Sequence, residues 1–265
     1  MSNPAETYES YMVPALFAPW SSRLIQAAKP QSGERILDLA CGTGIAARKM
    51  ASQIGSTGKI VGLDCSANML AVARNRAARE NLIIDWQEGR AEKLPFPDCS
   101  FDLVCCQFAL MFFTDRHAAL AEMHRVLKKG GRLVLNVWQS LDRHPFYQTL
   151  HNVIQNRLGM SGVEQIFALG DASELRKLFT EAGFQRVEIE SVSMTARFPN
   201  PDGYLAGEID VDTAAIPSMQ HLDEEARKAI TAAISDEMRE PLSHVIKEDH
   251  VVIPFHAHIV RAERN

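Results

Sequence analysis

The segment Cys41–Ala47 (CGTGIAA) contains the pattern G-x-G-x-x-A directly after an apolar run and at the start of a helical pattern. Glycine lets a ligand approach the backbone closely, and a turn from strand to helix lies at the carboxyl edge of a parallel sheet. The pattern satisfies the dinucleotide-binding fingerprint literally. Because the glycines alone do not name the ligand, an oxidoreductase that uses NAD or NADP is one open interpretation.

Two acidic residues near this turn bear on the choice of ligand. Asp38 lies three residues before Cys41, and Asp64 ends the next apolar run. Two unit charges about 6 Å apart interact by about 3 kcal/mol at an effective dielectric of about 20. A carboxylate at Asp38 therefore favours a ligand with positive groups over one that places a pyrophosphate at the helix N-terminus. The alternative is that Asp38 accepts hydrogen bonds from backbone amides of the loop.

Asp64 stands where an acidic side chain can accept hydrogen bonds from both hydroxyls of a ribose. The alternative role is that of an N-cap for the helix that follows. Ser66 already supplies such a cap, which favours ribose binding by Asp64.

Four segments in order resemble the class I S-adenosylmethionine-dependent methyltransferases, particularly the ubiquinone/menaquinone methylase-like branch, called methyltransferase type 11. The segments are LDLACGTG, GLDCSANMLAVAR, GRAEKLPFPDCSFDLV and ALAEMHRVLKKGGRLVL, within residues 34–138. The resemblance implies S-adenosyl-L-methionine as cofactor, S-adenosyl-L-homocysteine as product and methyl transfer as the reaction. After Trp138 it is looser and identifies no subfamily.

The resemblance also implies a set of cofactor-binding residues. They are Asp38, Ala40, Gly42, Gly44, Asp64, Cys65, Met69, Arg90, Ala91, Glu92 and Gln107. Residues 38–44 would hold the methionine part of the cofactor, and Asp64 would bind the ribose. Cys65 and Met69 would lie beside the adenine.

This chain departs from the family at one of these positions. Members often read G-D-A-E-x-L-P-F, where the aspartate meets the adenine amino group, whereas this chain has Arg90 at that position. The backbone contact of Ala91 could survive the change. The departure leaves open a non-catalytic cofactor-binding module of the same fold.

The elements that must position these residues form an alternating series. Apolar runs at 34–40, 59–64, 82–88, 101–109 and 132–138 predict strands covered on both faces. The alternating runs 186–198 and 250–264 predict a terminal antiparallel pair. The expected fold is α/β, a Rossmann-like doubly wound mixed sheet. The resemblance implies seven strands in the order 3-2-1-4-5-7-6, the last antiparallel.

Helical patterns lie between these strands. They cover 45–54, 67–80, 114–129 with Gly130 as the stop, and a segment from the capping residue Asp171 to Gly183. The first half of the chain therefore consists of βαβ units.

We expect one methyltransferase domain over 1–265, with a cofactor-binding core at 34–138. The insertion 199–249 is too long for a hairpin loop, and its amphipathic helix predicts a lid. That helix carries Ala226, Ile230, Ile234 and Met238 at intervals of four. Residues 141–169 are a second candidate lid. The N-terminal residues 1–30, which include Tyr8, Tyr11, Phe17 and Trp20, are a third and helical one.

The end of the fourth strand, 107–113, is expected to face the acceptor. It lacks the [DN]-P-P-[YF] sequence of methyltransferases acting on adenine or glutamine amino groups, and the chain has no Pro-Cys pair typical of cytosine C5 enzymes. The apolar tract suggests a small, largely apolar or aromatic acceptor, methylated by in-line displacement. Candidate substrate-binding residues are Tyr11, Phe108, Met111, Phe112, Trp138 and Tyr204. Each could instead be a core residue.

The catalytic residue stays unassigned, because a general base is needed only if the acceptor must lose a proton. Candidate bases are His144, His151 and His256, each of which could equally be an ordinary surface or core histidine. No metal is expected. The methylated atom, carbon, oxygen or nitrogen, is left open.

Composition limits the remaining classes of function. The chain has 46% hydrophobic and 23% charged residues, enough for a core without disulfides or metal. A net charge of −5 with no basic run longer than a pair disfavours nucleic acid. Five scattered cysteines suit a reducing compartment, so we expect a cytoplasmic protein. The expected assembly is a monomer or a homodimer. The longest apolar stretch falls short of the roughly 20 residues of a membrane span.

Overall fold

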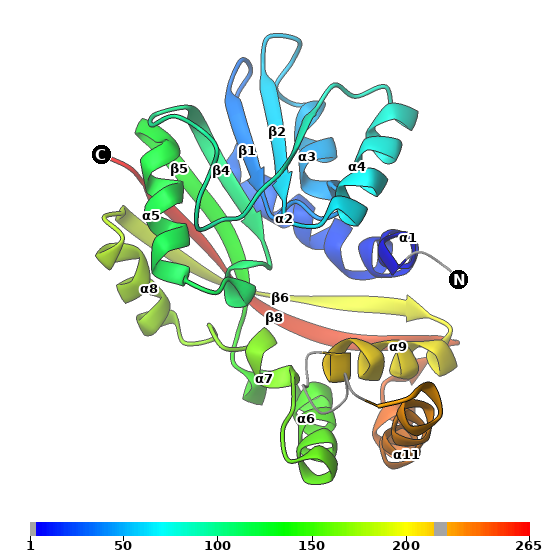
Figure 1. The fold of residues 1–265 in the computed structure, drawn as a ribbon. Helices are drawn as coiled ribbons and strands as arrows, with labels where there is room; N and C mark the ends of the chain where they lie inside the picture. The colour runs from blue at the N-terminus through cyan, green and yellow to red at the C-terminus, as the bar shows by residue number, and fades with distance from the viewer. Residues whose placement is uncertain (1–3, 215–221) are drawn as a thin grey trace. The chain divides into compact units, whose positions relative to one another are not determined.

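The computed structural model describes residues 4–214 and 222–265 of the chain. Two compact units are present. Unit 1 combines the chain up to Val137 with Asp171–Val192 and Ala257–Asn265, and unit 2 combines Trp138–Gly170 with Ser193–His256. Each unit is described by itself below (Figure 1).

The strands form one mixed sheet. They are β1 (Arg35–Leu39), β2 (Lys59–Asp64), β3 (Asp85–Glu88), β4 (Phe101–Gln107), β5 (Leu127–Trp138), β6 (Gln185–Pro199), β7 (Ile246–Lys247) and β8 (His250–Glu263). The order is β3-β2-β1-β4-β5-β8-β6, and β7 pairs antiparallel with β8. The strand β7 has only two residues and was not among the seven expected strands, so the expected seventh strand corresponds to β8. With this correspondence, the expected Rossmann-like order is confirmed.

Parallel pairing brings the polar ends of three strands to one edge of unit 1. β1 pairs in parallel with both β2 and β4, with Asp38 opposite Gly62 on one side and Cys105 on the other. The carboxyl ends of parallel strands meet at the same edge of a sheet. Asp38, Asp64 and Gln107 therefore lie at that edge, each on a different strand.

Three helices of unit 1 begin at residues whose side chains cap them. The helices of unit 1 are α1 (Pro4–Thr7), the π-helix η1 (Tyr8–Phe17), α2 (Ala18–Ala28), α3 (Ile45–Ala51), α4 (Ala67–Arg79), η2 (Leu110–Phe112), α5 (Arg116–Val126) and α8 (Ala172–Glu181). The three capped helices are α4, α5 and α8. The Ser66 side chain accepts a hydrogen bond from the Met69 amide, and Asp171 accepts from the Ser173 and Glu174 amides. Both predicted caps are confirmed.

Several predicted boundaries are wrong. The helix expected to reach Lys129 ends at Val126, because the buried Leu127 is already extended and pairs with Phe101. Gly130, with φ 75°, consequently lies inside β5 and not at a helix end. The third strand is expected to begin at residue 82 but begins at Asp85. Ile83, within the expected range, is 98% exposed. The helix α3 also stops at Ala51, short of the expected Ile54.

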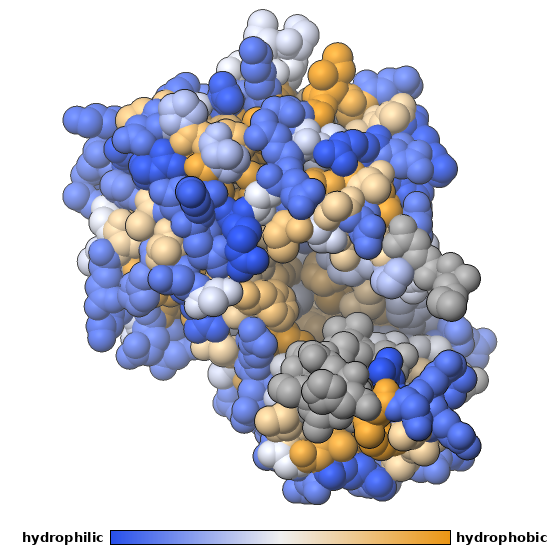
Figure 2. All heavy atoms as spheres, in the orientation of Figure 1, coloured by the Kyte–Doolittle hydropathy of each residue, from blue (hydrophilic) through white to orange (hydrophobic). Residues whose placement is uncertain are grey.

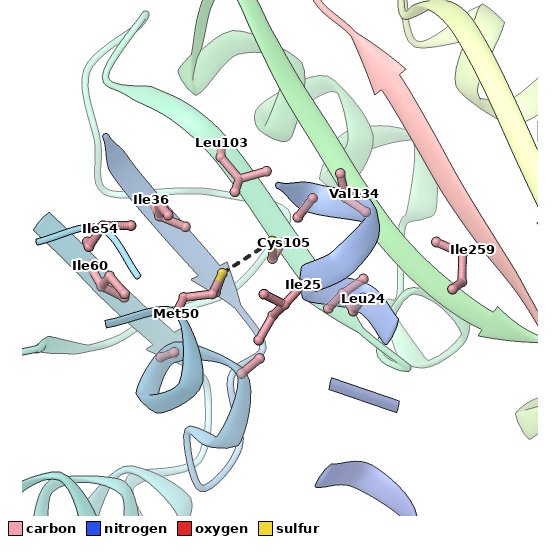
Figure 3. Packing of buried hydrophobic residues seen from close by; sticks show 13 residues of the cluster. Leu24, Ile25, Ile36, Met50, Ile54, Ile60, Leu103, Cys105, Val134 and Ile259 are labelled. Carbon is pink, nitrogen blue, oxygen red and sulfur yellow. Dashed lines mark hydrogen bonds between the residues drawn. The ribbon is translucent and has the colours of Figure 1, made fainter. Parts of the chain in front are cut away.

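One face of the sheet in unit 1 is covered by α2 and α3. Figure 3 shows their apolar side chains meeting those of the strands, with the Cys105 Sγ 3.8 Å from the Met50 Sδ. The cluster consists of Leu24, Ile25, Ala28, Ile36, Ala46, Ala47, Met50, Ile54, Ile60, Leu103, Cys105, Val134 and Ile259. Burial explains Cys105 and Cys106 as packing residues, as both are fully inaccessible.

A half-buried guanidinium ties the end of α2 to β1 and β5. Arg132 donates to both carboxylate oxygens of Glu34, at 2.6 and 2.9 Å, and to the backbone oxygens of Ala28 and Lys29. The substitution Arg132→Met would remove these contacts and leave the Glu34 carboxylate without its charge partner. We expect this variant to lose about 3 kcal/mol of unfolding free energy in urea denaturation.

The matched control is Arg186→Met, which removes an exposed pair with Glu263 at 2.7 Å. Exposed pairs contribute about 0–1 kcal/mol, so this variant should remain close to the parent. Equal losses in the two variants would contradict the role given to Arg132.

Unit 2 is mainly helical. Its helices are η3 (Leu141–Arg143), α6 (Pro145–Leu158), α7 (Val163–Ile166), α9 (Pro201–Ala214) and α11 (Glu224–Ser243). The helix α11 packs against α6 and α9 and buries Ile234, Met238 and Leu242. An amphipathic helix is therefore present in the insertion 199–249, as the spacing predicts.

The surface carries few large apolar side chains. On the face shown in Figure 2, hydrophilic residues predominate and hydrophobic residues form small groups. Within residues 4–214 and 222–265, no helix has both the length and the apolar character that crossing a membrane requires.

Candidate functional site

The loop after β1 makes a tight turn at the carboxyl edge of unit 1. Positive φ angles occur at Ala40 (53°), Gly42 (55°) and Gly44 (80°). The Cys41 amide donates to the Leu63 carbonyl at 3.0 Å, and the Gly44 amide donates to the Cys41 carbonyl at 2.8 Å. These bonds fix the loop between β1 and β2.

The two glycines of the loop have different roles. A Cβ built on Gly44 would lie 2.3 Å from the ring of Trp86, and one on Gly62 of β2 would also lie 2.3 Å from that ring. Gly44 is therefore required by packing inside the protein. A Cβ on Gly42 would meet nothing within 4 Å, so the backbone of Gly42 faces open space. Of the two, Gly42 is the one that a ligand can approach closely.

This difference predicts opposite outcomes for two alanine variants. Gly44→Ala combines a positive φ with a clash, and we expect it to lose about 2–4 kcal/mol of unfolding free energy. Gly42→Ala should lose only about 1 kcal/mol, for the positive φ alone. The added methyl group of Gly42→Ala should instead weaken S-adenosylhomocysteine binding about tenfold, by occupying space against the backbone. Urea denaturation and titration calorimetry would check both, and a stability loss in Gly42→Ala as large as in Gly44→Ala would contradict this assignment.

Asp38 lies at the end of β1 and is 1% exposed. Its Oδ2 accepts a hydrogen bond from the Ala47 amide at 2.8 Å, inside the first turn of α3. Asp38 therefore does accept a hydrogen bond from a backbone amide, which is the alternative role given for it above. Burial raises the pKa of Asp38 to about 7, opposed by the Ala47 amide and reinforced by Asp64. A cation bound beside this carboxyl would favour its ionised form.

Asp64 uses both carboxylate oxygens on backbone amides. Oδ2 accepts from Gly42 and Oδ1 accepts from Ser66, each at 2.8 Å. A carboxylate has about four acceptor positions, so two remain for other donors. The first bond places Asp64 beside the open face of Gly42.

Polar atoms without partners mark the same edge. Thr43 is 1% exposed, and its Oγ1 is buried with no hydrogen bond. The Gln107 Nε2 donates to the Phe17 carbonyl at 3.0 Å, whereas its Oε1 is buried and without a partner. A buried polar group without a partner is costly, and a bound ligand is one feature that can supply the missing partner. Together with the acidic groups and the open backbone of Gly42, these two atoms fit S-adenosylmethionine.

Arg90 lies after β3 with 66% of its side chain exposed. It is 3.5 Å from a Glu92 carboxylate oxygen and donates to the Thr114 Oγ1 at 3.4 Å. Glu92 in turn accepts from the Thr114 amide at 3.0 Å. These contacts join the loops after β3 and β4, while the buried Ala91 lies between Arg90 and Glu92. The resemblance implies an aspartate at position 90 that accepts a hydrogen bond from the adenine amino group. Arg90 has no carboxylate and cannot make this contact.

Cys65 is exposed and Met69 half-buried, in the loop after β2 and the first turn of α4. Asp64 directly precedes Cys65, and the Met69 amide donates to the Ser66 hydroxyl of the same turn. Contact of Cys65 and Met69 with adenine stays a prediction.

The candidate substrate residues of unit 1 have unequal exposure. Phe108 and Met111 are buried, and the Phe108 ring packs edge-to-face on Trp20 with centroids 5.5 Å apart. Phe112 is 53% exposed and Tyr11 half-buried. Phe108 and Met111 are therefore packed in the core, and contact of either residue with an acceptor stays a prediction.

Trp138 and Tyr204 belong to unit 2, where both are buried. The Tyr204 hydroxyl is 2.9 Å from that of Tyr147, which donates to Glu208 at 3.2 Å. Burial raises the pKa of Glu208 to about 7. Glu208 cannot be recognised from the sequence, because its partner Tyr147 is 61 positions away and no local pattern connects them.

The three candidate histidines are also in unit 2. His144 is buried, its Nε2 accepts from the His256 amide at 3.0 Å and its Nδ1 lies 3.1 Å from the Ser140 carbonyl. Burial lowers the pKa of His144 to about 4, so it is neutral and both ring nitrogens are engaged. His151 lies 3.5 Å from Glu164, and the His256 Nδ1 is 2.6 Å from the Ser193 hydroxyl. His144 thus has a structural role.

Known proteins resemble both the sequence and the fold. Residues 37–135 match the family described as "Methyltransferase domain". The chain is 33% identical over 194 residues to the ubiquinone/menaquinone biosynthesis C-methyltransferase UbiE of Neisseria meningitidis serogroup B, covering 69% of this chain and 79% of the relative. It is 44% identical over 115 residues to the protein of that name from Xanthomonas oryzae pv. oryzae, covering 43% and 46%.

Solved structures of similar fold include a putative methyltransferase from Bacillus halodurans, with TM-score 0.62, 21% identity and coverage of 92% of this chain and 98% of that one. Another is phosphoethanolamine N-methyltransferase 2 of Haemonchus contortus in complex with S-adenosyl-L-methionine, with TM-score 0.57, 19% identity and coverage of 93% and 53%. At these identities the likeness concerns the fold.

Proposed function

We propose that the chain, which belongs to the S-adenosylmethionine-dependent methyltransferases of the UbiE type, methylates a small, largely apolar or aromatic acceptor. The observation that carries the cofactor part of this proposal is the open backbone of Gly42, whose amide donates to Asp64, together with the buried carboxyl of Asp38, which accepts from Ala47 in the first turn of α3. Two acidic groups at a helix N-terminus disfavour a pyrophosphate and favour a cationic nucleoside. This argues against NAD or NADP.

The cofactor, when bound, would supply a methyl group activated by a sulfonium: the acceptor atom would bond to the methyl carbon as the S–CH₃ bond breaks, and the neutral thioether S-adenosylhomocysteine would leave. The residues of the chain bind and orient it. Asp64 would accept hydrogen bonds from the ribose hydroxyls while its bonds to the Gly42 and Ser66 amides hold the loop, and the carboxyl of Asp38 would attract positive charge. No covalent nucleophile is needed, and alignment with exclusion of water supplies much of the rate.

The acceptor class rests on two kinds of support. The relatives are named as C-methyltransferases of ubiquinone and menaquinone biosynthesis. The chain lacks the sequences typical of adenine, glutamine and cytosine methylation. A small aromatic quinol is therefore the first acceptor to test. The lid roles of 1–30 and 199–249, a cytoplasmic location and a monomer or homodimer stay predictions.

Titration calorimetry with S-adenosylmethionine, S-adenosylhomocysteine and NAD tests the proposal directly. We expect both sulfur nucleosides to bind and NAD to bind more weakly. No binding of either nucleoside at about 1 mM, a concentration at which even weak ligands are detected, would overturn it.

A second experiment identifies the acceptor. The protein is incubated with S-adenosylmethionine and either a short-chain quinol or a cell metabolite extract, and mass spectrometry reports what gains about 14 mass units, one CH₂ group. Cofactor binding without methyl transfer to the quinol or to any component of the extract would favour a non-catalytic binding module.

A further inference from the structure

Two tyrosines and one glutamate of unit 2 form a hydrogen-bonded network. The Tyr147 hydroxyl donates to the Glu208 Oε2 at 3.2 Å and lies 2.9 Å from the Tyr204 hydroxyl. A tyrosine hydroxyl has one hydrogen, so a Tyr147 that donates to Glu208 must accept from Tyr204. Tyr204 and Glu208 lie four residues apart on one face of α9, and Tyr147 lies in the first turn of α6. The hydrogen bonds therefore run from Tyr204 through Tyr147 to the carboxylate.

Aromatic rings pack against the two tyrosines of this network. The centroid of the Phe198 ring lies 4.7 Å from that of Tyr204, and the Phe255 centroid lies 5.5 Å from that of Tyr147. Both tyrosines are buried, whereas Glu208 is half-buried. Hydrogen bonds are stronger in such an apolar setting than in water. The network thus has a buried part that fixes the carboxylate and ends on a residue that solvent reaches.

The Glu208 carboxylate has few donors for a group in this setting. A carboxylate offers about four acceptor positions, and within residues 4–214 and 222–265 Tyr147 is the one donor described for it. For packing alone, apolar side chains in place of these polar ones would often be at least as stabilising. A carboxyl group kept in such a place indicates a role in binding or proton transfer.

Methylation of a hydroxylated acceptor releases a proton, and the candidate base His144 is poorly placed to take it. Both ring nitrogens of His144 are engaged, by backbone groups of Ser140 and His256. The most effective general base has a pKa near the working pH. Burial raises the pKa of Glu208 to about 7, while the Tyr147 hydroxyl lowers it. Glu208 therefore combines a suitable pKa with unused acceptor positions.

We propose that Glu208 accepts a hydrogen bond from a hydroxyl group of the acceptor and takes its proton during methyl transfer, while Tyr147 and Tyr204 position the carboxylate. This inference rests on the proposed function. Glu208 is thus a catalytic residue, and Tyr147 and Tyr204 are positioning residues.

The bonds and charges of this step balance. The acceptor atom bonds to the methyl carbon as the S–CH₃ bond breaks, the electron pair of that bond stays on sulfur, and the hydroxyl proton passes to the Glu208 carboxylate. If oxygen is methylated, the O–H electron pair stays on that oxygen. If a ring carbon is methylated, the pair forms the carbonyl of a dienone, which tautomerises back to the phenol. The neutral Glu208 then returns its proton to water.

Titration calorimetry with S-adenosylhomocysteine present tests the hydrogen bond without turnover. The probes are a short-chain quinol and its dimethyl ether, which keeps the ring but has no hydroxyl hydrogen. The parent should bind the quinol about tenfold more tightly than the ether, because only the quinol donates to the charged carboxylate. In Glu208→Gln the amide oxygen still accepts from Tyr147 and the amide NH₂ faces the ligand. The preference for the quinol should then fall to about twofold or less.

Single-turnover rates with the quinol test the proton transfer. Glu208→Gln should lower the rate about a hundredfold or more, while S-adenosylhomocysteine binds as in the parent. Tyr147→Phe should lower the rate about tenfold and Tyr204→Phe less, because Tyr204 acts only through Tyr147. Formate added to Glu208→Ala should restore part of the rate, which a purely structural role would not allow.

The matched control is Glu237→Gln. Glu237 is an exposed glutamate of the neighbouring helix α11 and pairs with Arg157 of α6. Exposed pairs contribute little, so this variant should match the parent in the preference for the quinol and in rate.

The outcomes separate the two proposals. If the parent protein does not bind S-adenosylhomocysteine, the proposed function fails, and this inference fails with it. If the parent binds it but binds the quinol no more tightly than the ether, or Glu208→Gln reacts within about threefold of the parent rate, the role of Glu208 alone is wrong. Methyl transfer to nothing by a parent that binds both ligands would overturn the proton transfer. Should Glu208→Gln not fold, an unchanged rate in Tyr147→Phe would overturn the positioning of Glu208.

Discussion

Replacing Asp64 with alanine is expected to weaken S-adenosylhomocysteine binding by a hundredfold or more. The variant would lose two hydrogen bonds from ribose hydroxyls to a charged acceptor, each contributing about 1.5–3 kcal/mol. It would also free the Gly42 and Ser66 amides, which Asp64 holds at 2.8 Å, so the loop would lose its fixed position. Titration calorimetry measures the change in affinity.

Two controls separate binding from folding. Asp64→Asn keeps an oxygen acceptor of similar size and should retain more of the affinity than alanine does. Asp85→Asn changes an exposed carboxylate on the neighbouring strand β3, which bonds only the exposed Gln87 among the contacts described, and should bind like the parent. A Kd for Asp64→Ala within about threefold of the parent, a loss below 1 kcal/mol, would remove Asp64 from the binding site.

The affinity for S-adenosylmethionine should rise with pH and level off above about pH 7, the pKa of Asp38 in the folded protein. The sign follows from linkage, since a cation binds best to the ionised carboxyl, which is the minor form below that pKa. Each unit of pH below it should therefore weaken binding by up to about tenfold. Calorimetry at several pH values, with buffers of different ionisation heat, measures both affinity and proton release.

Asp38→Asn provides the matched comparison. Its amide oxygen can still accept from Ala47, so the start of α3 is preserved while the titrating group is gone. We expect weaker binding that no longer changes with pH in this range. The same slope in Asp38→Asn and the parent would assign the pH dependence to another group.

The strands at the centre of the sheet were predictable because local sequence decides them. Lys59–Asp64 has the same bounds in sequence and structure, since its run of apolar residues is buried on both faces of a parallel sheet. The boundary between α5 and β5 was not predictable in this way. Leu127 continues the helical stripe and also suits a buried strand position, and only its pairing with Phe101 decides between them.

The site was predictable in part for a similar reason. The strand ends and the turn between them are local, so Asp38, Gly42 and Asp64 could be placed together from the sequence. The different roles of Gly42 and Gly44 could not, because they depend on Trp86 of β3. Glu9 and Arg48 are charged residues 39 positions apart, and charged residues are usually exposed. Only tertiary packing buries this pair.

The contact of the Trp86 ring with both Gly44 and Gly62 has an evolutionary consequence. A side chain at either glycine position would require a smaller residue at position 86, so these three sites must vary together across homologous sequences. The same coupling can be tested in the laboratory, where shortening Trp86 to leucine should partly rescue Gly62→Ala. A methyltransferase without the indole would then be free to use a different loop sequence after its first strand.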